Sequence, residues 1–394
     1  MLILDTTLRE GEQTPGVAFP PHVKLAIAEL LDKLGVDIIE VGHPIVSDGI
    51  RMAVEQVATK GLRARVAAHA RSLRPDVELA LECGAQFLGI FYCVSQERLD
   101  NVFRSPLSAA IDQITDVIQY ARESSPGIMI RYTPEDTVRS SYNNVLEAAK
   151  AATQAGADII SIADTTGYMM PHVRSMYDYV ATLKEDLLAA GLEPMIAVHC
   201  HNDRGLALAN ALDGLRAGAE IIDVSTLGLG ERAGIVDLAQ LIATLPEFAP
   251  EKSLDLPRLT ELYALVSSYT GIPIPPTAPV VGANAFTHCA GVHTHAAAKD
   301  PAHYESLSPE AFGRIRSFAL DHMSGISSVQ AAFDLLGIPF EKEIGHQALR
   351  HIKRIGESGR AVPLEELRLI ISWLNHHPER PAQEVQQIAQ VVNG

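Results

Sequence analysis

Two histidines separated by a single residue, His199 and His201, follow a short apolar run at residues 195–198. If this run is a β-strand, side chains two positions apart point to the same face, so both imidazoles reach toward one point. Neutral imidazole is the commonest metal ligand in proteins. The pair therefore indicates half of a divalent metal site, although paired histidines also occur on solvated strand ends without a metal.

A carboxylate elsewhere in the chain could complete this site. Glu10 follows the first apolar run, and with His199 and His201 it makes a set of two histidines and one carboxylate. Such a set leaves coordination positions open, which is typical of catalytic rather than structural metal sites. A 2-oxo acid could chelate the metal there, and the metal would act as a Lewis acid on its ketone. Asn202 and Asp203 are the expected hydrogen-bonding partners of the histidines.

The elements that must position these residues alternate along the first 230 residues. Short apolar runs, which predict strands, lie at residues 2–8, 38–42, 65–70, 87–94, 129–133, 159–164, 195–201 and 221–227. Longer amphipathic stretches between them predict helices, for example at 22–34, 106–124 and 171–190. Eight such repeats predict an α/β protein whose parallel strands close into a (β/α)8 TIM barrel. An open doubly wound sheet is the alternative, but it usually carries a glycine-rich loop after its first strand, which this chain lacks.

In a (β/α)8 barrel, the active site lies at the carboxyl ends of the strands. At those ends the sequence places Arg9, Glu10, Gln13, Glu40, His43, His69, Arg71, Arg131, Thr133, Glu135, Asp136, Asp164, Thr165, His199, His201, Glu231 and Arg232. Any one of these side chains could be an ordinary solvated loop residue. Their convergence predicts a site that concentrates Arg and His for an anionic substrate.

The bulk composition is that of a soluble globular protein, with 47% hydrophobic and 20% charged residues. The formal net charge of −16 argues against nucleic acid or an anionic membrane surface as a partner. No apolar run approaches the roughly 18 to 20 residues of a membrane span, and no export signal is visible. The four cysteines show no paired spacing, so we expect a reduced, cytoplasmic protein.

The composition changes after the eight repeats. The expected parts are a catalytic barrel, a proline-rich linker, a lid subdomain and a helical C-terminal subdomain, at residues 1–270, 271–280, 281–335 and 336–394. Apolar spacing predicts helices in the last two parts, at residues 327–336, 343–354 and 363–376. The C-terminal lid region should therefore be mostly helical.

A second cluster of possible ligands lies in the expected lid. It contains His288, Cys289, His293 and His295. One interpretation is a structural zinc site, although no closely spaced cysteine pair supports it. The other is that His293 and the nearby Tyr304 serve as acid/base groups that close over the barrel mouth.

Four segments resemble the homocitrate synthase and 2-isopropylmalate synthase family. They are DTTLREGEQTPG at residues 5–16, HCHNDRGLA at 199–207, GLGERAG at 228–234 and HCAGVH at 288–293. The resemblance runs in order over nearly the whole chain and is closest to the homocitrate synthase branch. It implies an acyltransferase that condenses acetyl-CoA with a 2-oxo acid, assisted by a divalent cation (Mg, Mn, Zn or Co).

The resemblance also implies roles for individual residues. It assigns the metal to Glu10, His199 and His201. It assigns catalysis to Arg9, Glu135, His293 and Tyr304, with His293 and Tyr304 contributed by the partner subunit of a homodimer. The expected substrate-binding residues are Gln13, Glu40, His69, Arg131, Thr133 and Thr165.

The first-choice substrate is 2-oxoglutarate, which would give homocitrate after thioester hydrolysis. Relatives that take it often carry an acidic residue where Gly89 stands and Thr-Thr-Pro at residues 42–44. Here His43 and Arg71 would add positive charge to the pocket. The alternatives are the same reaction on oxaloacetate, phosphonopyruvate or 2-oxoisovalerate, a metal-dependent carbon–carbon lyase of the same superfamily, or a barrel that only binds.

Overall fold

The computed structural model describes residues 1–289 and 300–377. The chain divides into two compact units, Met1–Ile274 and Pro275–Gly394. In the part of the chain that is described, no helix is both long and apolar enough to cross a lipid bilayer.

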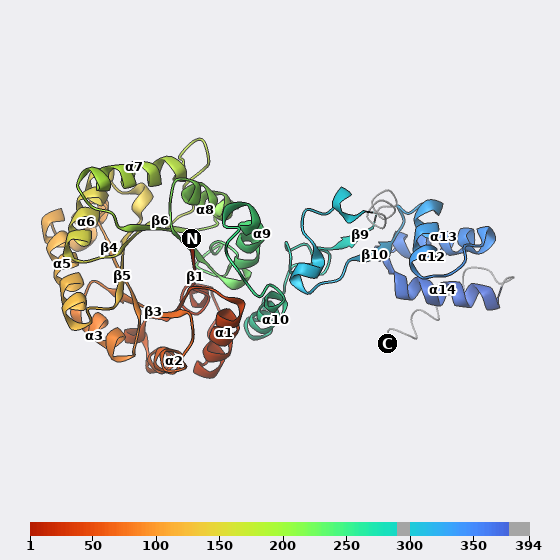
Figure 1. The fold of residues 1–394 in the computed structure, drawn as a ribbon, viewed down its shortest axis with the longest axis horizontal. Coiled ribbons are helices and arrows are strands. Elements are labelled where there is room, and N and C mark those ends of the chain that lie inside the picture. The colour runs from red at the N-terminus through yellow and green to blue at the C-terminus, as the bar shows by residue number, and fades with distance from the viewer. Residues whose placement is uncertain (290–299, 378–394) are drawn as a thin grey trace. The chain divides into compact units, whose positions relative to one another are not determined.

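The first unit is a closed barrel of eight parallel strands, arranged in chain order (Figure 1). The strands are β1 (Leu2–Asp5), β2 (Ile38–Gly42), β3 (Arg65–Arg71), β4 (Phe87–Cys93), β5 (Met129–Glu135), β6 (Ile159–Asp164), β7 (Met195–Cys200) and β8 (Ile221–Val224). β1 pairs with β8 to close the ring, with Leu2 opposite Ile221. The expected (β/α)8 barrel is confirmed, and each expected strand is present with its ends moved by a few residues.

Helices surround the barrel (Figure 1). They are α1 (Pro21–Leu34), α2 (Asp48–Ala58), α3 (Arg74–Glu82), α4 (Gln96–Arg98), α5 (Leu107–Ser124), α6 (Tyr142–Ala155), α7 (Met176–Ala189), α8 (Ala207–Arg216), α9 (Leu238–Phe248) and α10 (Arg258–Thr270). Helix α1 ends at Gly35, whose φ of 103° lies in the left-handed region that glycine adopts without strain. Helix α7 begins later than the expected residue 171, because Met170 and Arg174 pair across a turn first.

The lower part of the barrel interior is apolar. Its buried cluster contains Leu4, Ile38, Ala67, Phe87, Ile159, Ala197 and Ile221, most of which come from the first residues of their strands. Side chains two positions apart on a strand share a face, so the next inward-facing layer lies two residues further along each strand. That next layer is polar, and it forms the floor of the site.

A buried lysine ties the first two strand ends to helix α1. Lys24 is 1% exposed, and its Nζ donates to the carbonyl oxygens of Leu8 at 2.7 Å and Val41 at 2.8 Å. The same nitrogen lies 2.7 Å from Glu12 Oε2. Because Leu8 and Glu12 flank Arg9 and Glu10, this ammonium fixes the loop that carries them.

We expect Lys24→Met to destabilise the protein by about 3 kcal/mol, because it leaves a carboxylate and two carbonyls without their partner. Urea unfolding followed by circular dichroism measures this loss. Lys33→Met on the exposed side of the same helix is the control, with an expected change within about 0.5 kcal/mol. Equal stabilities for the two variants would contradict this role of Lys24.

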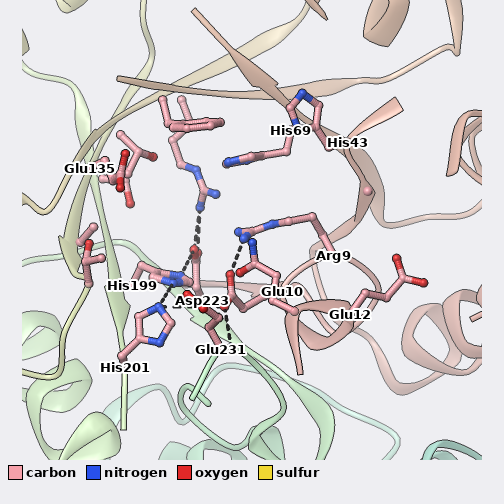
Figure 2. A pocket seen from close by; sticks show the side chains of 18 of the residues that line it. Arg9, Glu10, Glu12, His43, His69, Glu135, His199, His201, Asp223 and Glu231 are labelled. Atoms are coloured by element: carbon pink, nitrogen blue, oxygen red, sulfur yellow. Dashed lines mark hydrogen bonds and ion pairs between the residues drawn. The ribbon is translucent and has the colours of Figure 1, made fainter. Parts of the chain in front are cut away.

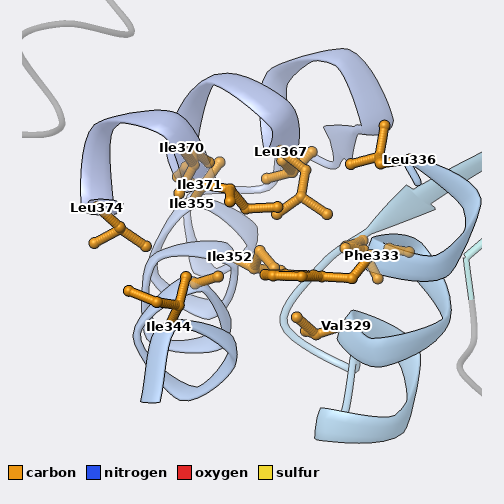
Figure 3. Packing of buried hydrophobic residues seen from close by; sticks show 14 residues of the cluster. Val329, Phe333, Leu336, Ile344, Ile352, Ile355, Leu367, Ile370, Ile371 and Leu374 are labelled. Atoms are coloured by element: carbon orange, nitrogen blue, oxygen red, sulfur yellow. The ribbon is translucent and has the colours of Figure 1, made fainter. Parts of the chain in front are cut away.

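Among its described residues, the second unit combines three α-helices with a small sheet. Its helices are α12 (Ile326–Leu335), α13 (Lys342–Glu357) and α14 (Leu364–His376). Their buried faces form one cluster that includes Phe333, Ile352 and Leu367 (Figure 3). The expected helical C-terminal region is confirmed. The strands β9 (Thr287–His288), β10 (Ser317–Leu320) and β11 (Val362–Pro363) were not expected, since two to four residues are too short to show a pattern.

Candidate active site

A polar layer lies above the apolar one inside the barrel. It contains Glu40, His69, Arg131, His199 and Asp223. Each of them lies two residues after a residue that belongs to the apolar layer or, for Arg131, after Met129, which packs against that layer. Toward the carboxyl ends of the strands, a cavity of about 430 Å³ opens above this layer. Charged groups therefore form the floor of a pocket whose base is sealed by the hydrophobic core.

The cavity brings together most of the expected site residues (Figure 2). Its wall contains Arg9, Glu10, Gln13, His69, Arg131, Thr133, Glu135, Thr165, His199 and His201. Glu40, an expected substrate-binding residue, is not among the residues that line this cavity. Its side chain is fully buried behind the wall, where it accepts hydrogen bonds from Thr6 Oγ1 and Arg9 Nε, both at 2.7 Å.

The three candidate metal ligands converge at one side of the cavity. Ligand atoms of Glu10, His199 and His201 all lie within 4.8 Å of one another, and all three residues are buried. The two histidine Nε2 atoms are 3.2 Å apart, and His201 Nε2 is 4.0 Å from Glu10 Oε1. Metal–ligand bonds of about 2.0 to 2.2 Å place neighbouring ligand atoms about 3 Å apart, close to the spacing of the two imidazoles. With Glu10 beside them, the three side chains form a group that could hold a divalent cation.

Asp223 on β8 orients one of these histidines. Its Oδ2 lies 3.0 Å from His199 Nδ1, which places the donor on Nδ1 and leaves the Nε2 lone pair directed at His201. A carboxylate behind a ligating histidine is the usual support of a metal site. Asp223 was missed in the sequence, and the available signal was a lone charge in the apolar strand β8.

Asn202 and Asp203 do not support the histidines as expected. Asn202 Oδ1 accepts a hydrogen bond from the backbone nitrogen of Ala207, at the start of α8. Asp203 forms an ion pair with Arg232, with Arg232 Nε 2.8 Å from Asp203 Oδ1. Both residues therefore stabilise the loops around the pocket.

The electrostatic surroundings favour the ionisation states that bind a metal. Burial alone would raise the pKa of Glu10, but the positive charge of Arg9, together with smaller contributions that include a backbone hydrogen bond from Glu231, outweighs it and lowers that pKa. Burial lowers the pKa of His201 to about 4, and the neighbouring His199 adds to this effect. At neutral pH, Glu10 is therefore an ionised ligand and His201 a neutral one, as metal binding requires.

Arg131 lies at the floor rather than free in the pocket. It is 2% exposed, and its Nη1 lies 2.9 Å from both carboxylate oxygens of Asp223. Its Nη2 lies 3.4 Å from Glu40 Oε1. Its Nε has no hydrogen-bond partner among the described residues. Arg131 therefore supplies positive charge to the cavity while two buried carboxylates hold it in place.

Another part of the cavity wall carries hydroxyl groups and a carboxylate. Thr133 Oγ1 and Ser161 Oγ are buried and have no hydrogen-bond partner within residues 1–289 and 300–377. Both line the cavity, as do Thr165 and Glu135. Glu135 forms an ion pair with Arg98, with 3.0 Å between Arg98 Nη2 and Glu135 Oε1. Unpaired buried hydroxyls next to a cavity are suited to a ligand that completes their hydrogen bonds.

The two acid/base groups expected in the lid belong to the second unit of the chain. His293 lies outside the described residues, as does His295 of the alternative zinc cluster. Tyr304 belongs to the second unit, where it is 43% exposed. In that unit His288 Nε2 lies 2.8 Å from Glu305 Oε1, and Cys289 Sγ lies 3.1 Å from Asp321 Oδ2.

A closed (β/α)8 barrel with charged residues gathered at its carboxyl-end cavity defines the class as a TIM-barrel enzyme. The family comparisons agree with this class. The HMGL-like family model matches residues 1–266, and the model described as homocitrate synthase post-HMGL domain-like matches residues 280–360. The chain therefore belongs to the HMGL-like family, and its expected kinship with homocitrate and 2-isopropylmalate synthases is confirmed.

Named relatives span most of the chain. A homocitrate synthase of Pyrococcus horikoshii is 43% identical, over 86% of this chain and 92% of its own length. A homocitrate synthase of Methanopyrus kandleri is 37% identical, over 94% of this chain and 91% of its own. A 2-isopropylmalate synthase of Methanocaldococcus jannaschii is 36% identical, over 94% and 70% respectively.

Solved structures agree on the barrel. The hydroxymethylglutaryl-CoA lyase of Pseudomonas aeruginosa has a TM-score of 0.59 at 20% identity, covering 69% of this chain and 93% of its own. The HMG-CoA lyase of Brucella melitensis has a TM-score of 0.57 at 22% identity, covering 68% and 98%. At this level of identity the likeness concerns the fold alone.

We expect Asp223→Asn to weaken Mn²⁺ binding by about 10- to 100-fold, because His199 loses the carboxylate that fixes its ring. Isothermal titration calorimetry with Mn²⁺ measures this effect on the purified protein.

Asp203→Asn is the matched control. It removes a carboxylate that lies close along the chain to the histidines but forms its ion pair with Arg232 instead, so we expect an affinity within about threefold of the wild type. Equal losses in the two variants, or none at Asp223→Asn, would contradict the assignment of Asp223.

Proposed function

We propose that this protein condenses acetyl-CoA with a 2-oxo acid, with 2-oxoglutarate as the first choice, and hydrolyses the product thioester to give homocitrate. The observation that carries the proposal is the convergence of Glu10, His199 and His201 with Arg9 in one cavity. The homocitrate synthases among the relatives support the choice of substrate.

A divalent cation held by Glu10, His199 and His201 would supply Lewis acidity to the ketone of the 2-oxo acid. Arg9 borders the same space, since its Nη1 pairs with Glu10 Oε2. This guanidinium is well placed to stabilise the negative charge that develops on the ketone oxygen as the new carbon–carbon bond forms. Its ion pairs with Glu10 and Glu40 would hold it in this orientation.

The 2-oxo acid carboxylate would be held by Thr133, Thr165 and the charge of Arg131. The unpaired hydroxyl of Thr133 supports this placement, because it gains a hydrogen bond only when a ligand arrives. Ser161, whose hydroxyl is equally unpaired, is a further candidate on the same wall. The near end of the substrate would thus be fixed between the metal ligands and this wall.

Proton transfer is assigned to Glu135, His293 and Tyr304. These groups would remove a proton from the methyl of acetyl-CoA, so that its carbon attacks the ketone carbon. A proton then returns to the alkoxide, and water cleaves the thioester to release CoA. In this proposal the protein is a homodimer, and each barrel uses His293 and Tyr304 of the partner subunit.

The alternatives differ in the 2-oxo acid that is used or in whether a carbon–carbon bond is formed or cleaved. Oxaloacetate, phosphonopyruvate or 2-oxoisovalerate would need the same metal and base. They would need different residues around the side chain of the acid. A carbon–carbon lyase would use the metal without needing His293, so substituting His293 separates the two reactions. The 2-isopropylmalate synthase among the relatives keeps the branched 2-oxo acid in the panel.

We expect the purified protein to release CoA from acetyl-CoA when 2-oxoglutarate is supplied, with homocitrate identified by mass spectrometry. Chelation with EDTA should abolish release, and added Mn²⁺ or Mg²⁺ should restore it, because the carbonyl loses its Lewis acid. The other three acids are assayed alongside. Turnover that is unaffected by chelator, or none with any acid, would refute the proposal.

Mixing two inactive variants tests the shared site. Glu10→Ala and His293→Ala should each be inactive alone, but together they should regain up to about a quarter of wild-type activity. Random exchange makes half the dimers mixed, and one of their two sites then has both groups intact. No recovery, with exchange confirmed by native mass spectrometry, would place both residues in the same subunit's site.

A further inference from the structure

A nearly buried carboxylate in the second unit lies next to the tyrosine proposed for proton transfer. Glu305 directly follows Tyr304 in the chain, and its side chain is only 8% exposed. Tyr304 itself is 43% exposed. The exposed tyrosine is therefore joined to a residue whose own side chain lies inside the unit.

Arg316 holds this carboxylate with two nitrogens. Its Nε lies 2.5 Å from Glu305 Oε1, and its Nη2 lies 2.6 Å from Glu305 Oε2. A bidentate pair of this kind fixes orientation as well as distance. The hydrogen bond from Arg316 lowers the pKa of Glu305, so the carboxylate is ionised at neutral pH. Arg316 directly precedes β10, so the pair ties the segment of Tyr304 to that strand.

The same carboxylate binds the residue that ends β9. His288 Nε2 lies 2.8 Å from Glu305 Oε1, and an ionised acceptor places the imidazole proton on this nitrogen. β9 also pairs with β10 (Figure 1), where Phe318 is opposite His288 and their rings stack with centroids 5.8 Å apart. His293 follows His288 by five residues in the sequence. Glu305 is thus bound to the strand that leads toward His293.

The residue after His288 is anchored as well. Cys289 Sγ lies 3.1 Å from Asp321 Oδ2, and Asp321 directly follows β10. The other oxygen of this carboxylate, Oδ1, accepts a hydrogen bond from the backbone nitrogen of Met323 at 2.8 Å. His288 and Cys289 are therefore both held by residues that are themselves fixed at the two ends of β10.

We propose that Glu305 is a positioning residue for proton transfer, which sets the segment of Tyr304 against the strand that leads to His293 by binding Arg316 and His288 together. This inference rests on the function proposed above. One peptide bond joins Glu305 to Tyr304, and one hydrogen bond joins it to His288. Loss of its charge would therefore release the two segments from each other. A misplacement of about 1 Å at a reacting group can cost about 100-fold in rate.

Glu305→Gln tests this role, because it keeps the shape of the side chain but removes the charge that Arg316 and His288 bind. We expect kcat for the condensation to fall about 10- to 100-fold. The Mn²⁺ affinity and the KM for the 2-oxo acid depend on residues of the barrel, so both should change less than about threefold.

Glu310→Gln is the matched control. Glu310 also pairs with Arg316, at 3.3 Å, but its side chain is 60% exposed, and its removal leaves the bond between Glu305 and His288 in place. We expect kcat to stay within about twofold of the wild type, since an exposed ion pair contributes little.

Arg316→Lys separates positioning from charge alone. Lysine keeps the positive charge but cannot bind both carboxylate oxygens in the geometry of a guanidinium. We therefore expect kcat to fall at least about fivefold, again with little change in the KM for the 2-oxo acid. Melting curves establish that each variant is folded.

The outcomes distinguish this inference from the function on which it rests. An active wild type whose kcat survives both Glu305→Gln and Arg316→Lys, or falls equally in Glu310→Gln, would overturn the positioning role alone. A change confined to the KM for the 2-oxo acid would overturn it too. A wild-type protein that releases no CoA with any 2-oxo acid would overturn the proposed function, and this inference with it.

Discussion

The structure depends on a closed circuit of buried charges at the floor of the barrel. Charged and ionisable groups follow one another around it in the order Glu10, Arg9, Glu40, Arg131, Asp223, His199 and His201, and the last returns to Glu10. Removing charges from water is costly, and each member is tolerated only because its neighbours compensate it. Three carboxylates face two guanidiniums, and the remaining negative charge lies where two imidazoles point at each other. A divalent cation bound there would balance this negative charge and accept the lone pairs of both imidazoles.

The barrel is what makes this circuit possible. Its members come from five strands or strand ends that are far apart in the chain, and closure between β1 and β8 brings Glu10 opposite the β7 histidines. An open sheet would leave β1 and β8 at separate edges. The apolar layer below excludes water from the floor, which strengthens each ion pair. Lys24 secures the loop from outside by holding Leu8 and Glu12.

Much of this could be predicted from the sequence, because the relevant signals are local. Eight apolar runs specify the strands, and the spacing of His199 and His201 specifies a shared face. The supporting residues could not be predicted in the same way. Asp223 is a single charge in a strand, and only the barrel places it behind His199. Glu40 follows the same strand-end pattern as residues that line the cavity, but packing sets it behind them.

In the proposed function, a metal bound by Glu10, His199 and His201 holds the 2-oxo acid. A crystal structure grown with Mn²⁺ and 2-oxoglutarate, with anomalous data collected at the manganese edge, tests this directly. The account predicts one strong peak bonded to Glu10 Oε1 and both histidine Nε2 atoms, with the keto acid completing its coordination. Manganese bound elsewhere, or a keto acid bound in the cavity without metal contact, would contradict it.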